Sequence, residues 1–99
     1  GVEPKVFSPN QDGYHDVVSL TYSFERPNNV LSVSIWNASG YKLRTILENQ
    51  NISMQGFVHW DGTDDNGNLA PTGIYIVVFD YFNAEGVRVV QKETCVLSL

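Results

Sequence analysis

The densest turn chemistry in the chain is the stretch WDGTDDNGN at residues 60–68, which is followed closely by PTGIY at residues 71–75. Asp and Asn side chains accept hydrogen bonds from backbone amides two residues further on, and glycine adopts a positive φ without steric cost. Because apolar and aromatic runs flank this stretch on both sides, it predicts a strand, a tight turn and a second strand. The feature constrains the architecture strongly and indicates no reaction.

Apolar and polar residues alternate along most of the chain, which is typical of half-buried β-strands. The alternation predicts strands over 18–24, 31–36, 41–47, 57–60, 74–82 and 87–99, with a short one around 5–7 and a polar connection at 48–51. Such short strands, separated by turn signals, favour an all-β fold, an immunoglobulin-like antiparallel β-sandwich of about seven strands. The predicted core comprises Val18, Leu20, Tyr22, Phe24, Leu31, Val33, Ile35, Leu43, Phe57, Tyr75, Val77 and Phe79.

Two local expectations follow from the same alternation. Trp60 should lie at one end of the core, where its indole N–H can donate to a loop carbonyl. In the last strand, Gln91 and Glu93 fall on the same face as Val89 and Cys95. A β-bulge near Gln91 or Lys92 would shift the alternation by one residue, so that the apolar residues of both halves need not share a face with these polar ones. Such a bulge is therefore expected.

Composition bounds the kind of partner. The 99 residues are enough for one domain with a single core, predicted to span residues 1–99, and the formal net charge is −5. Six Lys and Arg residues are scattered without a basic cluster, so no nucleic-acid partner is expected. No run approaches the ~18 apolar residues needed to span a bilayer, so no membrane insertion is expected. Cys95 is the single cysteine, so it is expected to be a small buried hydrophobe.

The chain begins at Gly1 without Met, which indicates a module of a longer protein, expected at its C-terminal end.

One predicted strand has an apolar outer face. In 74–82, Asp80 shares a face with Ile76 and Val78, and an unpaired carboxylate is costly in a core, so this face should point outward. Trp36 falls on the outer face of its own strand by the same alternation. If the two strands are neighbours, Trp36, Ile76 and Val78 form one apolar patch, a hypothetical docking surface. The alternative is that they are scattered surface residues or are covered by a loop.

Carboxylates suggest one metal site. Asn10, Asp12 and Asp16, with Gly13 at a sharp turn, approximate part of a calcium-binding loop, although Ca²⁺ takes six to eight oxygens. The alternative is an Asx turn, in which the side chains of Asn10 and Asp12 satisfy backbone amides. Asp61, Asp64 and Asp65 form a second acidic loop, which is better explained as a hairpin turn. No cofactor other than this calcium ion is expected.

The sequence offers no catalytic residues. It holds two histidines, and it lacks both a Gly-x-Ser-x-Gly elbow and a glycine-rich phosphate loop. We therefore expect a protein that is not an enzyme. A glycan partner is an alternative, because β-sandwiches can carry exposed aromatic platforms; the candidate rings are Tyr14, Trp36, Tyr41 and Tyr81.

Several blocks resemble a known family. The run FSPNQDGYHD at 7–16 resembles the opening of immunoglobulin-like C-terminal domains on surface and secreted proteins of Bacteroidetes, including gliding-motility and type IX sorting domains. The run VSIWNASGYKLR at 33–44 resembles a hairpin in the immunoglobulin-like domain of the flagellar hook-capping protein. The blocks at 60–67 and 71–75 match both groups, and KETCVLSL at 92–99 is similar to the tail of lamin-tail-type surface proteins.

The resemblance implies a non-enzymatic C-terminal accessory module of an exported cell-envelope or surface protein, serving protein–protein docking, sorting or anchoring. The expected location is the periplasm, the outer-membrane surface or the extracellular space. The expected partner is a protein or the preceding domain of the same chain. The alternative function is a carbohydrate-binding β-sandwich module.

Overall fold

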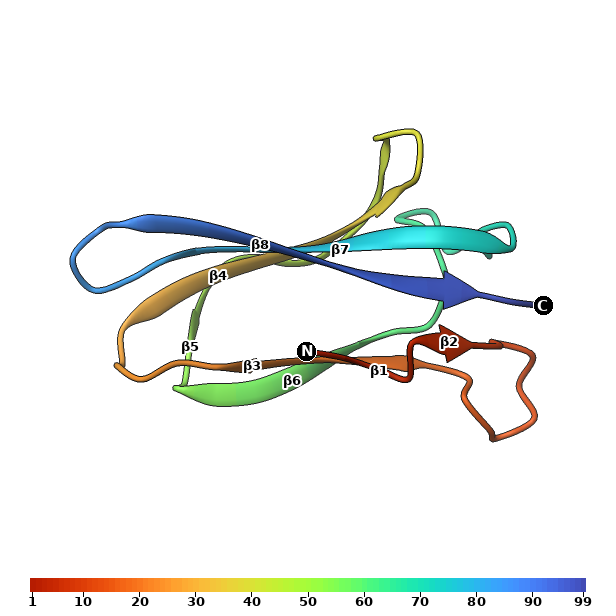
Figure 1. Ribbon diagram of the computed structural model, residues 1–99, viewed down its shortest axis with the longest axis horizontal. Helices are drawn as coiled ribbons and strands as arrows, with labels where there is room; N and C mark the ends of the chain where they lie inside the picture. The colour runs from red at the N-terminus through yellow and green to blue at the C-terminus, as the bar shows by residue number, and fades with distance from the viewer.

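The computed structural model describes residues 1–99, and the chain forms eight strands and no helix. The strands are β1 (Val2–Glu3), β2 (Val6–Phe7), β3 (Val18–Ser23), β4 (Asn29–Asn37), β5 (Lys42–Ile52), β6 (Gln55–Trp60), β7 (Gly73–Phe82) and β8 (Arg88–Leu97). A three-stranded sheet in the order β1-β3-β6 faces a five-stranded sheet in the order β2-β8-β7-β4-β5 (Figure 1). The predicted all-β sandwich is confirmed.

The core lies between the two sheets, where alternate residues of each strand point inward. Residues with little or no exposure come from both layers, and the cluster comprises Val2, Phe7, Val18, Leu20, Leu31, Val33, Ile35, Trp60, Ala70, Tyr75, Val77, Phe79, Cys95 and Leu97. Tyr22 and Leu43 are partly buried and pack against this cluster. Trp60 is fully buried and its Nε1 donates to the Thr63 carbonyl at 2.8 Å, as predicted.

The prediction that Phe57 belongs to the core is wrong. Its side chain is 63% exposed, on the outer face of β6. Side chains along a strand alternate between faces, so the burial of Trp60 sends Val58 inward and Phe57 outward. An aromatic residue occurs on each face of this short strand, and the packing of Trp60 decides which face is buried.

The predicted bulge in the last strand is also wrong. β7 and β8 pair without a register shift from Gly73 opposite Leu97 to Phe82 opposite Arg88. Gln91 and Glu93 therefore lie on the inner face, in line with Cys95. They tolerate this position because the narrow sheet does not cover that half of β8: Gln91 is exposed and Glu93 is half-exposed. The polar residues mark an open edge of the sandwich rather than an irregular strand.

Residues 48–51, predicted as a connection, are part of β5, which continues to Ile52. β5 is the edge strand of the wide sheet, so its polar side chains remain in solvent while its backbone pairs with β4. The pairing includes register shifts, and Asn49 has a φ of 48°. Polarity alone does not distinguish such an edge strand from a loop.

The first seven residues connect the two layers. β1 pairs with β3 in the narrow sheet, and β2 pairs with β8 in the wide sheet. The β2–β8 pair is parallel, whereas the sequence predicted antiparallel strands. Phe7 on β2 is fully buried, and its ring centroid lies 5.4 Å from that of Trp60. β2 therefore contributes to the core despite its length of two residues.

The two phenylalanines at positions 7 and 57 provide a matched test of this arrangement. We expect Phe7→Ala to lower the free energy of unfolding by about 3–5 kcal/mol, because it leaves a cavity beside Trp60. Phe57→Ala should cost less than about 1 kcal/mol, because the ring is mostly in solvent. Urea unfolding followed by tryptophan fluorescence measures both. Equal losses would contradict the assignment of the two faces.

Candidate functional site

The loop between β2 and β3 places Asn10, Asp12 and Asp16 as acceptors for its own backbone. Asn10 Oδ1 accepts the N–H of Asp12 at 3.2 Å, and Asp12 Oδ1 accepts the N–H of Tyr14 at 2.8 Å. Asp16 accepts the N–H groups of Gln11 and Gly13 through its two oxygens, at 2.9 and 2.7 Å. The structure thus brings the three predicted ligands into one loop, where their oxygens are engaged with amides.

These contacts correspond to the Asx-turn alternative, which accounts for the loop without an ion. The chain has no group of three or more His, Cys, Asp and Glu side chains arranged to hold a metal ion. Both oxygens of Asp16 accept charge-assisted hydrogen bonds, so a calcium ion would have to compete with the amides that shape the loop. Calcium binding at Asn10, Asp12 and Asp16 stays a prediction of the sequence.

We expect this loop to depend on Asp16 and not on calcium. Asp16→Ala should lower the free energy of unfolding by about 1–2 kcal/mol, because two backbone donors lose their acceptor. Glu25→Ala, another acidic surface substitution, is the control and should change little. Calorimetric titration of the unsubstituted domain with millimolar Ca²⁺ should give no binding heat. Heat that disappears in Asp16→Ala would instead establish the calcium site.

The second acidic loop is a turn tied to its own backbone. Asp61 Oδ1 accepts the Thr63 N–H at 3.1 Å and the Thr63 hydroxyl at 2.6 Å. Asp64 Oδ1 accepts the N–H groups of Asn66 and Asn68, both at 2.9 Å. Gly62 has a φ of 88°, and an added Cβ would lie 3.0 Å from Leu97 and Pro9. Glycine is therefore favoured at this position. Thr63 and Leu69 form an isolated antiparallel bridge across the turn, but the loop connects β6 of the narrow sheet to β7 of the wide sheet, so the expected hairpin between these two strands is wrong.

Arg44 binds several residues of this loop, a role that was not predicted from the sequence. Its guanidinium NH1 donates to Thr63 Oγ1 at 2.6 Å and lies 3.7 Å from Asp61 Oδ1. Its Nε lies 3.9 Å from Asp65 Oδ1, which also accepts the N–H of Thr45 at 3.0 Å. The available signal was a pair of cations, Lys42 and Arg44, in a predicted strand ahead of an acidic turn, and it did not show which of the two meets the turn. Arg44 therefore joins β5 to the loop that follows β6.

The hydrogen bond from the Thr63 hydroxyl is the main cause that lowers the pKa of Asp61, and Arg44 adds to the effect. A carboxylate with a lowered folded-state pKa stabilises the fold above its unfolded value of 3.8, and this stabilisation is lost as the pH falls through the lowered pKa. The turn should therefore weaken in acid.

We expect Asp61→Asn to reduce the loss of stability below pH 3.8, because the variant has no carboxylate to protonate at this position. Thr63→Val removes the main hydrogen bond and should reduce the same acid dependence. Urea unfolding at a series of pH values from about 6 to about 2.5 measures the effect. Parallel stability profiles for all three proteins would contradict the role assigned to this bond.

The outer face of the wide sheet holds the second predicted site. β4 and β7 are neighbours, with Trp36 opposite Ile76 and Ser34 opposite Val78. The structure therefore brings Trp36, Ile76 and Val78 together, and with Gly40 and Lys92 they line one shallow hollow of about 310 Å³. The three apolar side chains are half-buried, and Trp36 Nε1 donates to Ser34 Oγ at 2.9 Å.

Asp80 points outward on the same face, as predicted. Its carboxylate accepts two hydrogen bonds from Arg88, at 2.9 Å from Nε and 2.7 Å from NH2. The hydrogen bond from Arg88 is the main cause that lowers the pKa of Asp80. Ile74, further along β7, is 55% exposed and continues the apolar surface away from this ion pair. The outer face is thus apolar near Trp36 and charged near Arg88.

The four aromatic residues considered for glycan binding do not form one platform. Tyr14 stacks on His15, with ring centroids 4.0 Å apart. Tyr81 meets Phe24 between the sheets at 4.6 Å, whereas Trp36 lies on the outer face of the same sheet. Tyr41 is 71% exposed in the turn before β5. Stacking on a sugar needs rings that share one surface, so this arrangement gives the carbohydrate alternative no specific support.

Candidate nucleophiles and bases are not assembled either. Cys95 is buried as predicted, and burial raises its pKa to about 11, which disfavours the reactive thiolate. His15 lies against Tyr14 in the β2–β3 loop, and His59 lies beside Phe57 on the outer face of β6. Neither histidine forms a hydrogen bond with a serine or carboxylate side chain that would suggest a catalytic pair.

Comparison with known proteins identifies the family. The chain matches the CHU_C type IX secretion signal domain over residues 2–96. It belongs to this family. The match confirms the resemblance to immunoglobulin-like sorting domains of Bacteroidetes, so this chain is a sorting domain of an exported protein. No curated protein matches the chain. The structure has no helix with the length and hydropathy that a membrane crossing requires.

A solved structure supports the fold. PorZ is described as an essential bacterial surface component of the type IX secretion system of Porphyromonas gingivalis. The chain superposes on part of PorZ with a TM-score of 0.60 and 18% sequence identity, covering 100% of this chain and 11% of PorZ. At this identity the likeness shows a shared fold and nothing further.

Proposed function

We propose that this type IX secretion signal domain is a non-catalytic C-terminal module of a longer exported protein. Its task is to direct that protein through the secretion machinery by docking to one of the machinery's proteins, at the outer membrane or cell surface. The family match over residues 2–96 supports the sorting role. The occurrence of a similar fold within PorZ, a surface component of that secretion system, is compatible with it.

The observation that carries the docking part is the apolar hollow around Trp36, Ile76 and Val78 on the outer face of the wide sheet. In a two-layer sandwich the outer face of an antiparallel sheet is normally polar, because water covers it. Tryptophan, isoleucine and valine on neighbouring strands are only partly buried there, and a partner can bury the surface that is left exposed. A shallow hollow beside a tryptophan suits an apolar anchor of a protein partner.

Charge adds a property of the partner. The domain has a formal net charge of −5, and Lys92 is the one cation that lines the hollow. Opposite charges at the rim of an interface accelerate encounter and fix its orientation. Because the only charged residue lining the hollow is this cation, the proposed partner surface is apolar at its centre and carries an acidic group opposite Lys92, whatever the net charge of the domain. The non-catalytic part of the proposal is supported by carboxylates that are engaged with backbone amides and by the buried thiol of Cys95.

A passenger experiment tests the sorting role. We expect residues 1–99, fused behind a signal peptide and a reporter domain, to carry the reporter out of a bacterium that has the type IX machinery. The reporter should stay in the periplasm when the domain is absent or when the machinery is inactivated. Fractionation and immunoblotting of cells and medium measure the result. Equal release with and without the domain would contradict the sorting role.

The docking surface has a separate test within the same fusion. We expect Ile76→Ser with Val78→Ser to reduce export about tenfold or more, because loss of two apolar contacts of about 1 kcal/mol or more each weakens the complex. Phe57→Ser is the matched control, since it removes an exposed apolar side chain from the opposite layer. Circular dichroism checks that each variant folds. Export by a folded double variant equal to that of the control would refute the docking surface.

A further inference from the structure

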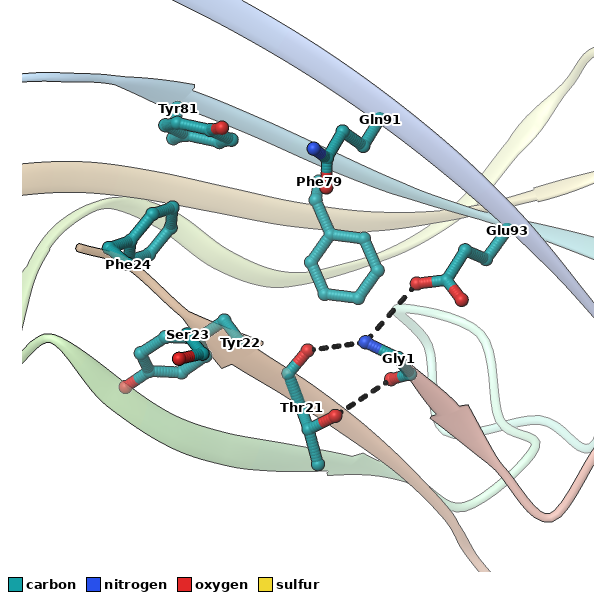
Figure 2. A pocket seen from close by; sticks show the side chains of 9 residues that line it. All are labelled: Gly1, Thr21, Tyr22, Ser23, Phe24, Phe79, Tyr81, Gln91 and Glu93. Carbon is teal, nitrogen blue, oxygen red and sulfur yellow. Dashed lines mark hydrogen bonds and ion pairs between the residues drawn. The ribbon is translucent and has the colours of Figure 1, made fainter.

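The sandwich is open on one side, between the end of β3 and the wide sheet. A cavity of about 250 Å³ lies there, with Thr21 and Ser23 of β3 on one side and Phe79 and Tyr81 of β7 on the other (Figure 2). Gln91 and Glu93 of β8 line it as well, which is why these two polar residues are tolerated on an inner face. Of the aromatic residues that line the cavity, Phe79 is buried, whereas Tyr22, Phe24 and Tyr81 keep part of their surface exposed.

The backbone of β3 has an unpaired edge beside this cavity. On one edge β3 pairs with β6 along its whole length, from Val18 to Ser23. On the other edge it pairs with β1 at Ser19 and Leu20, and the Thr21 N–H donates to the Gly1 carbonyl at 2.8 Å. Backbone groups of successive residues point to alternate edges of a strand, so Ser23 directs its N–H and C=O to the same edge as Thr21. No strand lies opposite Ser23 on that edge.

The position of Gly1 shows how this edge can be completed. Its amino nitrogen donates to the Thr21 carbonyl at 2.7 Å (Figure 2). Together with the Thr21 N–H that donates to the Gly1 carbonyl, this gives the two hydrogen bonds that a regular antiparallel pair exchanges. The same nitrogen lies 3.2 Å from Glu93 Oε2. When it is part of a peptide bond this charge is absent, and Lys5, whose Nζ lies 3.7 Å from Glu93 Oε1, still pairs with the carboxylate.

We propose that the residues directly before Gly1 in the longer chain continue β1 along β3 and close this cavity. This inference rests on the proposed role as a module of a longer protein. Val2 pairs with Leu20, so the register places the residue immediately before Gly1 opposite Tyr22 and the second residue before Gly1 opposite Ser23. Val2 points into the core, so alternation turns the side chain of the residue before Gly1 toward Phe79. That side chain is expected to be apolar.

The connecting segment is the occupant that the geometry favours over a separate strand. Direction and register are already set by the pairs of β1 with β3, so the chain needs only to remain extended. A covalently attached segment is present at a high effective concentration, whereas a strand from a second copy or another protein must bind from solution. A foreign strand would also have to share the edge with whatever precedes Gly1. Pairing the edge removes a site at which two copies could associate.

Hydrogen exchange of the Ser23 amide tests this proposal. In the natural chain begun about ten residues before Gly1, we expect NMR to show Ser23 exchanging about tenfold or more slowly than in the 99-residue domain. Proline at the second position before Gly1 removes the donor to the Ser23 carbonyl and should abolish that gain. Proline at the eighth position before Gly1, outside the pairing, is the matched control and should preserve it. Thr21 should be protected in every version.

The outcomes separate this inference from the proposed function. Equal exchange at Ser23 with and without the natural extension overturns the inference, whatever the export assay shows. Protection in the 99-residue domain that rises with protein concentration assigns the edge to a second copy and also overturns it. Failure of residues 1–99 to export a reporter refutes the sorting role, while protection of Ser23 in the extended chain can still be observed.

Discussion

The structure depends on an unequal pairing of layers, in which three strands must bury the inner face of five. Hydrophobic side chains stabilise the fold only where the opposite layer excludes water from them. β3 and β6 supply Leu20 and Trp60, and β4 and β7 of the other layer supply Val33 and Val77, all fully buried. Beyond this overlap the inner face is half-exposed, and the chain places Glu93 there. The width of the narrow sheet thus determines which inward positions must be apolar.

This constraint explains which parts of the fold could be predicted from the sequence. Alternation located β3, β4 and β7 closely, because these strands lie within the overlap and show one apolar face. It failed at Gln91, where the inward face is not covered, so a regular strand was mistaken for one with a bulge. It failed at 48–51 because an edge strand keeps polar side chains on both faces. Alternation in the sequence shows which side chains share a face of a strand. Whether another sheet buries that face depends on the tertiary structure.

The same distinction applies to the candidate sites. The register of β4 and β7 was needed before Trp36, Ile76 and Val78 could be placed together, yet the sequence indicated each of them by its face. For the acidic loops the sequence left two alternatives open, because an ion site and an Asx turn use the same residue types. The hydrogen bonds show how the turns are formed, since Asp16 accepts two amides and Asp64 accepts two more, while calcium binding stays a prediction. Arg44 was missed because its partners are set by the packing of β5 beside a distant turn.

In the proposed function, the domain has to be recognised in the same way whatever protein precedes it, and the two layers provide a physical basis for this. The chain enters through β1 in the narrow sheet, and the apolar hollow at Trp36 lies on the outer face of the wide sheet. The segment that we propose to extend β1 would fill the gap between the layers without reaching that outer face, because the wide sheet itself lies between them (Figure 1). Backbone pairing along β3 needs no particular side chains except where one enters the cavity. Under these two proposals, attachment lies on the inner side of the wide sheet and recognition on its outer side, so the preceding sequence can vary without altering the proposed docking surface.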